Sequence, residues 1–182
     1  MSQAKMSISV RDMVYTALFA AILCAVAPFS FSIGPIPLSF ATLVIYLAAG
    51  SLKWKYSALS VLLYVALGAI GLPVFSGFEG GFYKIAGLTG GFIIGYIPLA
   101  LAAGYAVEIS KGKLWMFILG MVVGTALLYA LGTAWFMLQS GASLAAALMA
   151  CVVPFLVGDT IKIVLASIAA PQLRRAVEFS RR

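Results

Sequence analysis

The sequence has no histidine, two cysteines and few charged residues, and each shortage excludes a class of function. Only 9% of the 182 residues are charged, and five side chains are acidic. Without histidine the chain lacks the commonest metal ligand and the commonest general base, so we expect neither an enzyme nor a metal site. Cys24 and Cys151 both lie in apolar runs, which indicates buried small side chains rather than a disulfide framework.

The chain also lacks the phosphate-binding pattern G-x-x-x-x-G-K-[ST]. Any ATP used together with this protein must therefore be hydrolysed by another subunit. We expect no cofactor for this chain itself.

Apolar residues dominate what remains. They make up 64% of the chain, against about 45–50% in ordinary globular proteins. A transmembrane helix needs about 20 apolar residues to cross about 30 Å of hydrocarbon. We therefore predict one all-α integral membrane domain over residues 1–182, with six helices in a bundle. The predicted spans are 12–29, 38–52, 55–70, 86–107, 114–138 and 146–171.

The basic residues that give the net charge of +7 lie at the ends of these spans and do not form a nucleic-acid-binding patch. Lys84 and Lys162 are the two exceptions. Cytoplasmic loops of membrane proteins carry an excess of lysine and arginine, so both termini are predicted to face the cytoplasm, with lipid headgroups as further partners. The ten basic residues at segment ends are Lys5, Arg11, Lys53, Lys55, Lys111, Lys113, Arg174, Arg175, Arg181 and Arg182.

The first predicted span resembles a secretory signal peptide. Lys5 and Arg11 precede an apolar run that ends in the small-residue sequence Ala25-Val26-Ala27. Because several further apolar spans follow, we expect this helix to be retained.

Two opposite charges, Asp159 and Lys162, lie inside the last predicted span. An ionisable group at membrane depth costs from about 3 to above 10 kcal/mol, so it persists where it is paired or used. A spacing of three places both side chains on one helical face. A structural ion pair is the plain alternative, but a buried pair is weak evidence for stability. We therefore predict that Asp159 accepts and Lys162 donates hydrogen bonds to a bound ligand.

The stretch 71–95 holds eight of the eighteen glycines, and its residues 71–85 form the predicted outer loop between the third and fourth spans. It is either a flexible loop or an ordered lid over an outward-facing pocket. Phe75, Phe78, Phe82 and Tyr83 give it apolar surface to bury. Further candidate binding residues in this stretch are Glu79, Tyr83 and Thr89. Tyr129 and Trp135 lie level with it, and they either belong to the interfacial aromatic belt or stack on a flat ligand.

Small residues mark two of the predicted helices. Ala17, Ala21 and Ala25 recur at four-residue spacing in the first span, which permits close approach of another helix, internal or external. Gly120 and Gly124 in the fifth span are predicted to pack against a neighbouring helix within the bundle.

Several motifs together resemble the BioY family, the biotin-binding substrate-capture (S) subunits of energy-coupling-factor (ECF) transporters. They appear in family order between residues 35 and 166. The matching pieces are Pro35-Ile36-Pro37, Gly71-Leu72-Pro73-Val74-Phe75-Ser76-Gly77, Gly87-Leu88-Thr89-Gly90-Gly91-Phe92, Tyr129-Ala130-Leu131-Gly132-Thr133-Ala134-Trp135, and Pro154-Phe155 followed by Gly158-Asp159 and Lys162.

The resemblance implies high-affinity biotin binding and uptake across a prokaryotic cell membrane. It also implies a transmembrane coupling subunit and two cytoplasmic ATPases as partners. In that family the matching aspartate and lysine contact biotin, here Asp159 and Lys162, and the small residues of the first helix contact the coupling subunit, here Ala17, Ala21 and Ala25. The alternative function is a self-sufficient secondary transporter of biotin or another vitamin-like solute.

Overall fold

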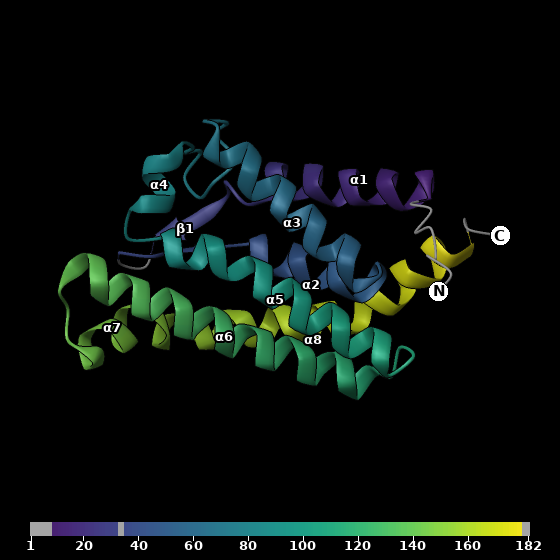
Figure 1. Ribbon diagram of the computed structural model, residues 1–182. Helices are drawn as coiled ribbons and strands as arrows, with labels where there is room; N and C mark the ends of the chain where they lie inside the picture. Colours follow the sequence, from purple (N-terminus) through teal and green to yellow (C-terminus); the bar gives the residue numbers. More distant parts are fainter. Residues whose placement is uncertain (1–8, 33–34, 180–182) are drawn as a thin grey trace, which may run out of the picture.

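The computed structural model describes residues 9–32 and 35–179, which leaves Lys5, Arg181 and Arg182 outside the described residues. Most of this chain is helical, and the helices run roughly side by side along one long axis (Figure 1). The elements in chain order are α1 (Val10–Val26), β1 (Ser30–Ser32), β2 (Pro37–Ser39), α2 (Ala41–Ser51), α3 (Trp54–Ala69), α4 (Phe82–Ala86), α5 (Gly90–Ile109), α6 (Leu114–Ser140), α7 (Leu144–Cys151) and α8 (Val153–Phe179).

Three helical stretches of the described chain are long and apolar enough to cross a membrane. They are Gly90–Ile109, Leu114–Ser140 and the nearly continuous pair α7–α8, Leu144–Glu178. Helices α2 and α3 are apolar but shorter. Large apolar side chains are exposed along the outer faces of α3, α6 and α8, as expected for surfaces that contact lipid.

The short helix α2 lies at the centre of the molecule. Nine of its eleven residues are buried, and it packs against α5 on one side and α8 on the other. Helix α1 packs against α3, and α3 packs in turn against α5 (Figure 1). Helix α2, which packs against α8, is therefore the helix most completely enclosed by protein.

Glycines bring α5 and α6 close together. A Cβ atom built on Gly120 would lie 2.5 Å from Ala106 Cβ, and one on Gly124 would lie 2.7 Å from Leu99 Cδ1. Because such approaches leave no room for a side chain, the two helices depend on glycine here. The predicted internal packing role of Gly120 and Gly124 is confirmed.

Three features of the chain differ from the predicted spans. Residues 30–32 and 37–39 form a small antiparallel hairpin, so the second helix begins at Ala41 and not at 38. The predicted sixth span is interrupted at Val152, whose backbone (φ −123°, ψ −58°) is not helical, and Pro154 falls in the first turn of a new helix. The predicted fourth span begins at Gly90, after the separate short helix α4.

The glycine-rich stretch has its own backbone hydrogen bonds. Phe75 N donates to Glu79 O over 2.8 Å, Gly77 N to Pro28 O over 2.9 Å, and Gly81 N to Gly68 O over 2.6 Å. These bonds join the segment to the ends of α1 and α3. Of the four aromatic residues expected to bury surface, Phe75 is buried against Tyr64, whereas Phe78, Phe82 and Tyr83 are exposed.

Candidate ligand-binding site

Asp159 and Lys162 lie on the face of α8 that packs against α2. Their helix begins at Val153, so both side chains follow shortly after its first turn. The carboxylate and ammonium groups are 3.0 Å apart, and only 5% and 7% of the respective side chains are exposed. The pair is therefore directed into the protein and away from lipid.

Three residues from other elements complete the polar cluster around this pair. Thr42 of α2 donates from Oγ1 to Asp159 Oδ1 over 3.2 Å, and Tyr129 of α6 donates from its hydroxyl to Asp159 Oδ2 over 2.6 Å. Lys162 Nζ donates to the carbonyl oxygen of Ser39 over 2.7 Å and to Thr42 Oγ1 over 3.0 Å. The cluster joins α2, α6, α8 and the end of β2 at one point.

The hydrogen-bond count differs between the two charged groups. An ammonium group has three hydrogens, and Lys162 directs one each to Ser39, Thr42 and Asp159. A carboxylate offers about four acceptor sites. Oδ1 of Asp159 receives two donors, whereas Oδ2 receives only Tyr129. One acceptor position on Oδ2 thus remains for a further donor.

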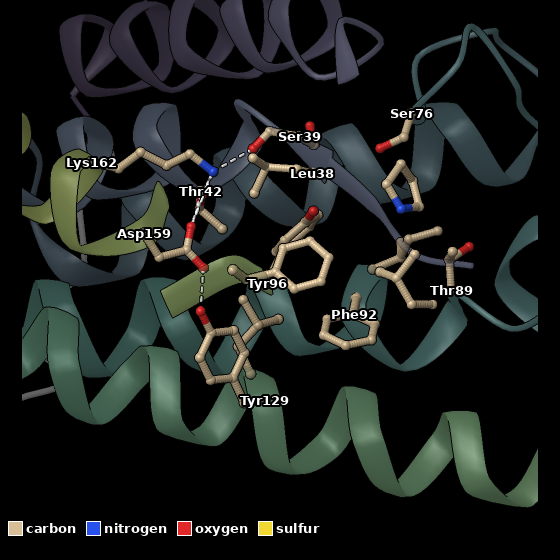
Figure 2. A pocket seen from close by; sticks show the side chains of 15 residues that line it. Leu38, Ser39, Thr42, Ser76, Thr89, Phe92, Tyr96, Tyr129, Asp159 and Lys162 are labelled. Carbon is tan, nitrogen blue, oxygen red and sulfur yellow. Dashed lines mark hydrogen bonds and ion pairs between the residues drawn. The ribbon is translucent and has the colours of Figure 1, made fainter. Parts of the chain in front are cut away.

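A cavity begins at this cluster and runs between α2, α5, α6 and α8. Figure 2 shows the polar cluster at one end, Ser76 and Thr89 at the other, and the rings of Phe92 and Tyr96 between them. The cavity is narrow, with about 40 Å³ open to the centres of water molecules. The lining side chains belong to Ile36, Pro37, Leu38, Ser39, Thr42, Ser76, Thr89, Phe92, Ile93, Tyr96, Leu128, Tyr129, Phe155, Asp159 and Lys162.

Thr89 provides a second polar atom at the far end of the cavity. Its Oγ1 is buried and has no hydrogen-bond partner in the described structure. A buried hydroxyl without a partner is costly, and native proteins keep few of them. Thr89 precedes the first turn of α5, so the hydroxyl is fixed to the start of a helix.

Three of the predicted binding residues lie outside this cavity. Glu79 forms an ion pair with Lys84 of α4, and Tyr83 is 64% exposed. Trp135 donates from Nε1 to the carbonyl oxygen of Gly87 over 2.9 Å, so its ring holds the turn between α4 and α5 against α6. Asp159, Lys162, Thr89 and Tyr129, by contrast, all line the cavity.

Sequence reasoning missed Thr42, Ser39, Phe92 and Tyr96 as lining residues. Threonine and aromatic residues are common in apolar helices, so nothing in the local pattern marks them. The one available signal is Thr42 itself, a polar residue near the start of a mostly apolar and mostly buried helix. Buried hydroxyls require partners, which directs attention to the charged pair of α8.

The three alanines of α1 point away from the rest of the molecule. Ala17, Ala21 and Ala25 are all exposed, and they share one helical face with Met13 and Val14, which are 56% and 58% exposed. This face is therefore apolar, narrow and unoccupied by other elements of the described chain.

These features define a class of protein. Apolar outer surfaces, buried charges and a polar-ended cavity within the helices belong to a multi-pass membrane protein that binds a small molecule.

Comparison with known proteins gives the particular family. The BioY family model matches residues 1–179. The biotin transporter BioY of Thermotoga maritima is 35% identical over 166 residues, which cover 91% of this chain and 96% of the relative. The probable biotin transporter BioY of Pyrococcus horikoshii is 36% identical over 164 residues, covering 90% and 96%. This chain belongs to the BioY family.

A solved structure has the same fold. The S-component for biotin from an ECF-type ABC transporter superposes with a TM-score of 0.85 at 26% sequence identity, and the match covers 96% of this chain and 95% of the other. The arrangement of helices described above is thus that of an S-component.

Proposed function

We propose that this protein binds biotin with high affinity and takes it up across the cytoplasmic membrane, as the S component of an ECF-type ATP-driven transporter. The observation that carries the proposal is the open acceptor position on buried Asp159, at the end of a cavity with apolar walls. The names of the relatives and of the structural neighbour support the choice of biotin. The protein is a binding subunit and not an enzyme.

Charge determines which end of biotin faces Asp159. Biotin combines a ureido ring with two N–H donors, an apolar bicycle and a carboxylate tail. A ligand carboxylate beside Asp159 would meet a like charge in a poorly solvated place, which is unfavourable. We therefore place a ureido N–H on Asp159 Oδ2, the bicycle between Phe92 and Tyr96, and the tail toward Thr89 and Ser76.

Lys162 has a supporting role in this arrangement. All three of its hydrogens are already used, so it reaches the ureido oxygen only by giving up a bond to Ser39 or Thr42. Its constant contribution is to balance the charge of Asp159 and to fix that carboxylate. Glu79, Tyr83 and Trp135 are not part of the proposed contact set.

The cavity must widen to admit this ligand. Its 40 Å³ holds about three water molecules, much less than a bicyclic ring with a side chain needs. Leu38 and Ser76 are lining residues that come from non-helical segments, which shift more readily than packed helices. We infer that the glycine-rich outer loop at 71–85 moves aside for entry and closes over bound biotin.

The proposed topology follows the distribution of charge. Helices α1, α2, α3, α5, α6 and the pair α7–α8 would be the six membrane-spanning segments of a single domain covering residues 1–182. Lys53, Lys111 and Arg174 line two adjoining hollows at one end of the bundle, and by the positive-inside rule we propose that this end faces the cytoplasm together with both termini. The outer end holds the mouth of the cavity.

A transmembrane coupling subunit and two cytoplasmic ATPases complete the proposed transporter. The exposed alanine face of α1 supports this assignment, because small residues allow a partner helix to approach closely. We propose Ala17, Ala21 and Ala25 as the contact with the coupling subunit.

An equilibrium titration of the detergent-purified protein tests the proposed function. Biotin should bind tightly, whereas lipoic acid, which shares the carboxylate tail but has no ureido group, should bind at least a hundredfold more weakly. Asp159→Ala should lose several kcal/mol of affinity, because it leaves ligand donors unpaired and Lys162 uncompensated. Unchanged biotin binding by folded Asp159→Ala protein, or equal affinity for lipoic acid, would refute the site.

A second measurement separates this function from its rival. Biotin uptake by cells that lack every coupling ATPase, driven by a proton gradient, would identify a self-sufficient secondary transporter. We expect uptake to require the ATPases.

A further inference from the structure

A second hollow lies at the end of the molecule opposite the cavity that begins at Asp159 and Lys162. It is formed by the end of α2, the turn between α5 and α6, and the last part of α8, which meet on the same side in Figure 1. The hollow has a volume of about 310 Å³. A neighbouring hollow of about 270 Å³ shares Val107, Arg174 and Glu178 with it, so the two form one region.

The walls of this region are amphipathic. Lys111, Arg174 and Arg175 face a single carboxylate, Glu178, in the larger hollow, which gives it a surplus of positive charge. The apolar part of the same lining consists of Val107, Leu114, Phe117, Ala170 and Pro171. A molecule that fits must therefore combine an anion with an adjoining apolar part.

The guanidinium group of Arg174 is held in place at the centre of the region. Its Nε donates to Glu178 Oε1 over 2.9 Å. Gly112, with φ +86°, leaves the space beside it, since a Cβ there would lie 2.7 Å from Arg174 Nη1. Nη1 is nevertheless buried without a hydrogen-bond partner, and so is Ser51 Oγ, which lines the smaller hollow. Two unpaired polar atoms thus adjoin one basic site.

Backbone geometry brings Lys111 to the rim. The turn after α5 closes with Gly112 N bonded to Val107 O over 2.9 Å, and Lys111 itself has a positive φ of 55°. A left-handed conformation is unusual for lysine, so the turn and its glycine fix where this side chain leaves the backbone.

We propose that this region binds the phosphate headgroup of an anionic phospholipid. The phosphate would lie between Arg174, Arg175 and Lys111, with the glycerol and upper acyl chain against Val107, Leu114 and Phe117. Arginine pairs well with phosphate, and basic pockets between transmembrane helices are suited to lipid headgroups. The apolar wall favours a lipid over an acidic peptide or a free anion.

A lipid bound at this site would contact the same two helices that form the substrate-binding cavity. The α2 and α8 helices that form this region also carry Thr42, Asp159 and Lys162 at their other ends. A Cβ built on Gly50 would lie 2.5 Å from Ala170 Cβ, so the two helices touch beside the hollow.

Lipid binding to matched variants tests the proposal. Purified protein receives phosphatidylglycerol, phosphatidylcholine with the same acyl chains, or glycerol phosphate, and bound lipid is measured by native mass spectrometry together with thermal stability. Lys111→Gln removes a charge from the hollow, and Lys113→Gln removes one from the same turn outside the lining residues. Phosphatidylglycerol should bind Lys111→Gln about fivefold more weakly than the natural protein, and Lys113→Gln nearly as well. In detergent without added lipid, biotin affinity should be unchanged in both variants, which confirms that they are folded.

Three results would overturn the proposal. Equal loss in both variants would indicate nonspecific attraction of basic residues to anionic lipid. The same stabilisation by glycerol phosphate alone would indicate a free anion as the ligand. Unchanged phosphatidylglycerol binding in Lys111→Gln, with weaker assembly with the coupling subunit, would assign the hollow to an acidic segment of that protein.

Discussion

The Tyr129 hydroxyl donates a hydrogen bond to Asp159 Oδ2 over 2.6 Å and thereby joins α6 to α8. This bond occupies one of the two acceptor positions on the oxygen that faces the cavity, and it fixes the direction of the other. Tyr129 therefore orients the carboxylate for its ligand, while Thr42 and Lys162 hold the opposite oxygen.

Replacing Tyr129 by phenylalanine should weaken biotin binding by about tenfold or more. The change removes one hydrogen bond to a charged group, which contributes about 1.5–3 kcal/mol, and lets the carboxylate turn. Isothermal titration of the purified variant measures the effect. Tyr105→Phe is the matched control, because Tyr105 is 54% exposed on α5 and does not line the cavity. Equal affinities in the two variants would contradict the orienting role.

Lys162 is expected to act mainly as the counter-charge of Asp159. Lys162→Met should lower the free energy of unfolding by about 3–5 kcal/mol, because a buried carboxylate loses its partner. The double variant Lys162→Met/Asp159→Asn should recover much of this stability, since neither charge remains. Its biotin affinity should stay low, because a neutral amide oxygen is a weaker acceptor than a carboxylate. Thermal unfolding and biotin titration of both variants separate the two effects, and a double variant as unstable as Lys162→Met would contradict this interpretation.

Replacing Thr89 should change biotin affinity without lowering stability. Its Oγ1 is buried and has no partner, so Thr89→Val should leave the melting temperature unchanged or slightly higher. Biotin should bind about fivefold more weakly, from the loss of one hydrogen bond of about 1 kcal/mol. Thr133→Val is the matched control, since its hydroxyl is likewise buried without a partner but does not line the cavity. Similar biotin affinity in both variants would remove Thr89 from the contact set.

Hydropathy placed the helices of this chain well, because long apolar runs and clustered charges are local signals. The charged pair of α8 was visible for the same reason. The β1–β2 hairpin was not, since strands of three residues are too short to show a period. The break at Val152 was also missed, because the apolar run continues through it and only the backbone changes.

The contacts around Asp159 were beyond sequence reasoning for a different reason. Thr42 and Asp159 are separated by 117 positions, and Tyr129 and Asp159 by 30, so no spacing rule joins them. The sequence left Tyr129 open between the interfacial aromatic belt and stacking on a ligand, and the structure shows a hydrogen bond from its hydroxyl to Asp159. Local chemistry identifies which residues need partners, but the packing of α2, α6 and α8 decides which partners they receive.

Gly124 allows a test of the helix packing that holds the cavity walls. A Cβ at this position would lie 3.0 Å from the carbonyl oxygen and 3.2 Å from the Cα of Leu99, as well as close to its side chain. Backbone atoms cannot turn aside as a flexible side chain can, so Gly124→Ala must push α5 and α6 apart. Overpacking of this kind costs about 1–3 kcal/mol.

The cost should appear as a lower melting temperature in detergent, with weaker biotin binding, because Tyr96 of α5 and Tyr129 of α6 line the same cavity. Val123→Ala is the neighbouring control, since Val123 is 46% exposed and faces outward from α6. It should change stability by much less. If Gly124→Ala were as stable as Val123→Ala, the close approach of the two helices would not be what keeps the cavity walls in place.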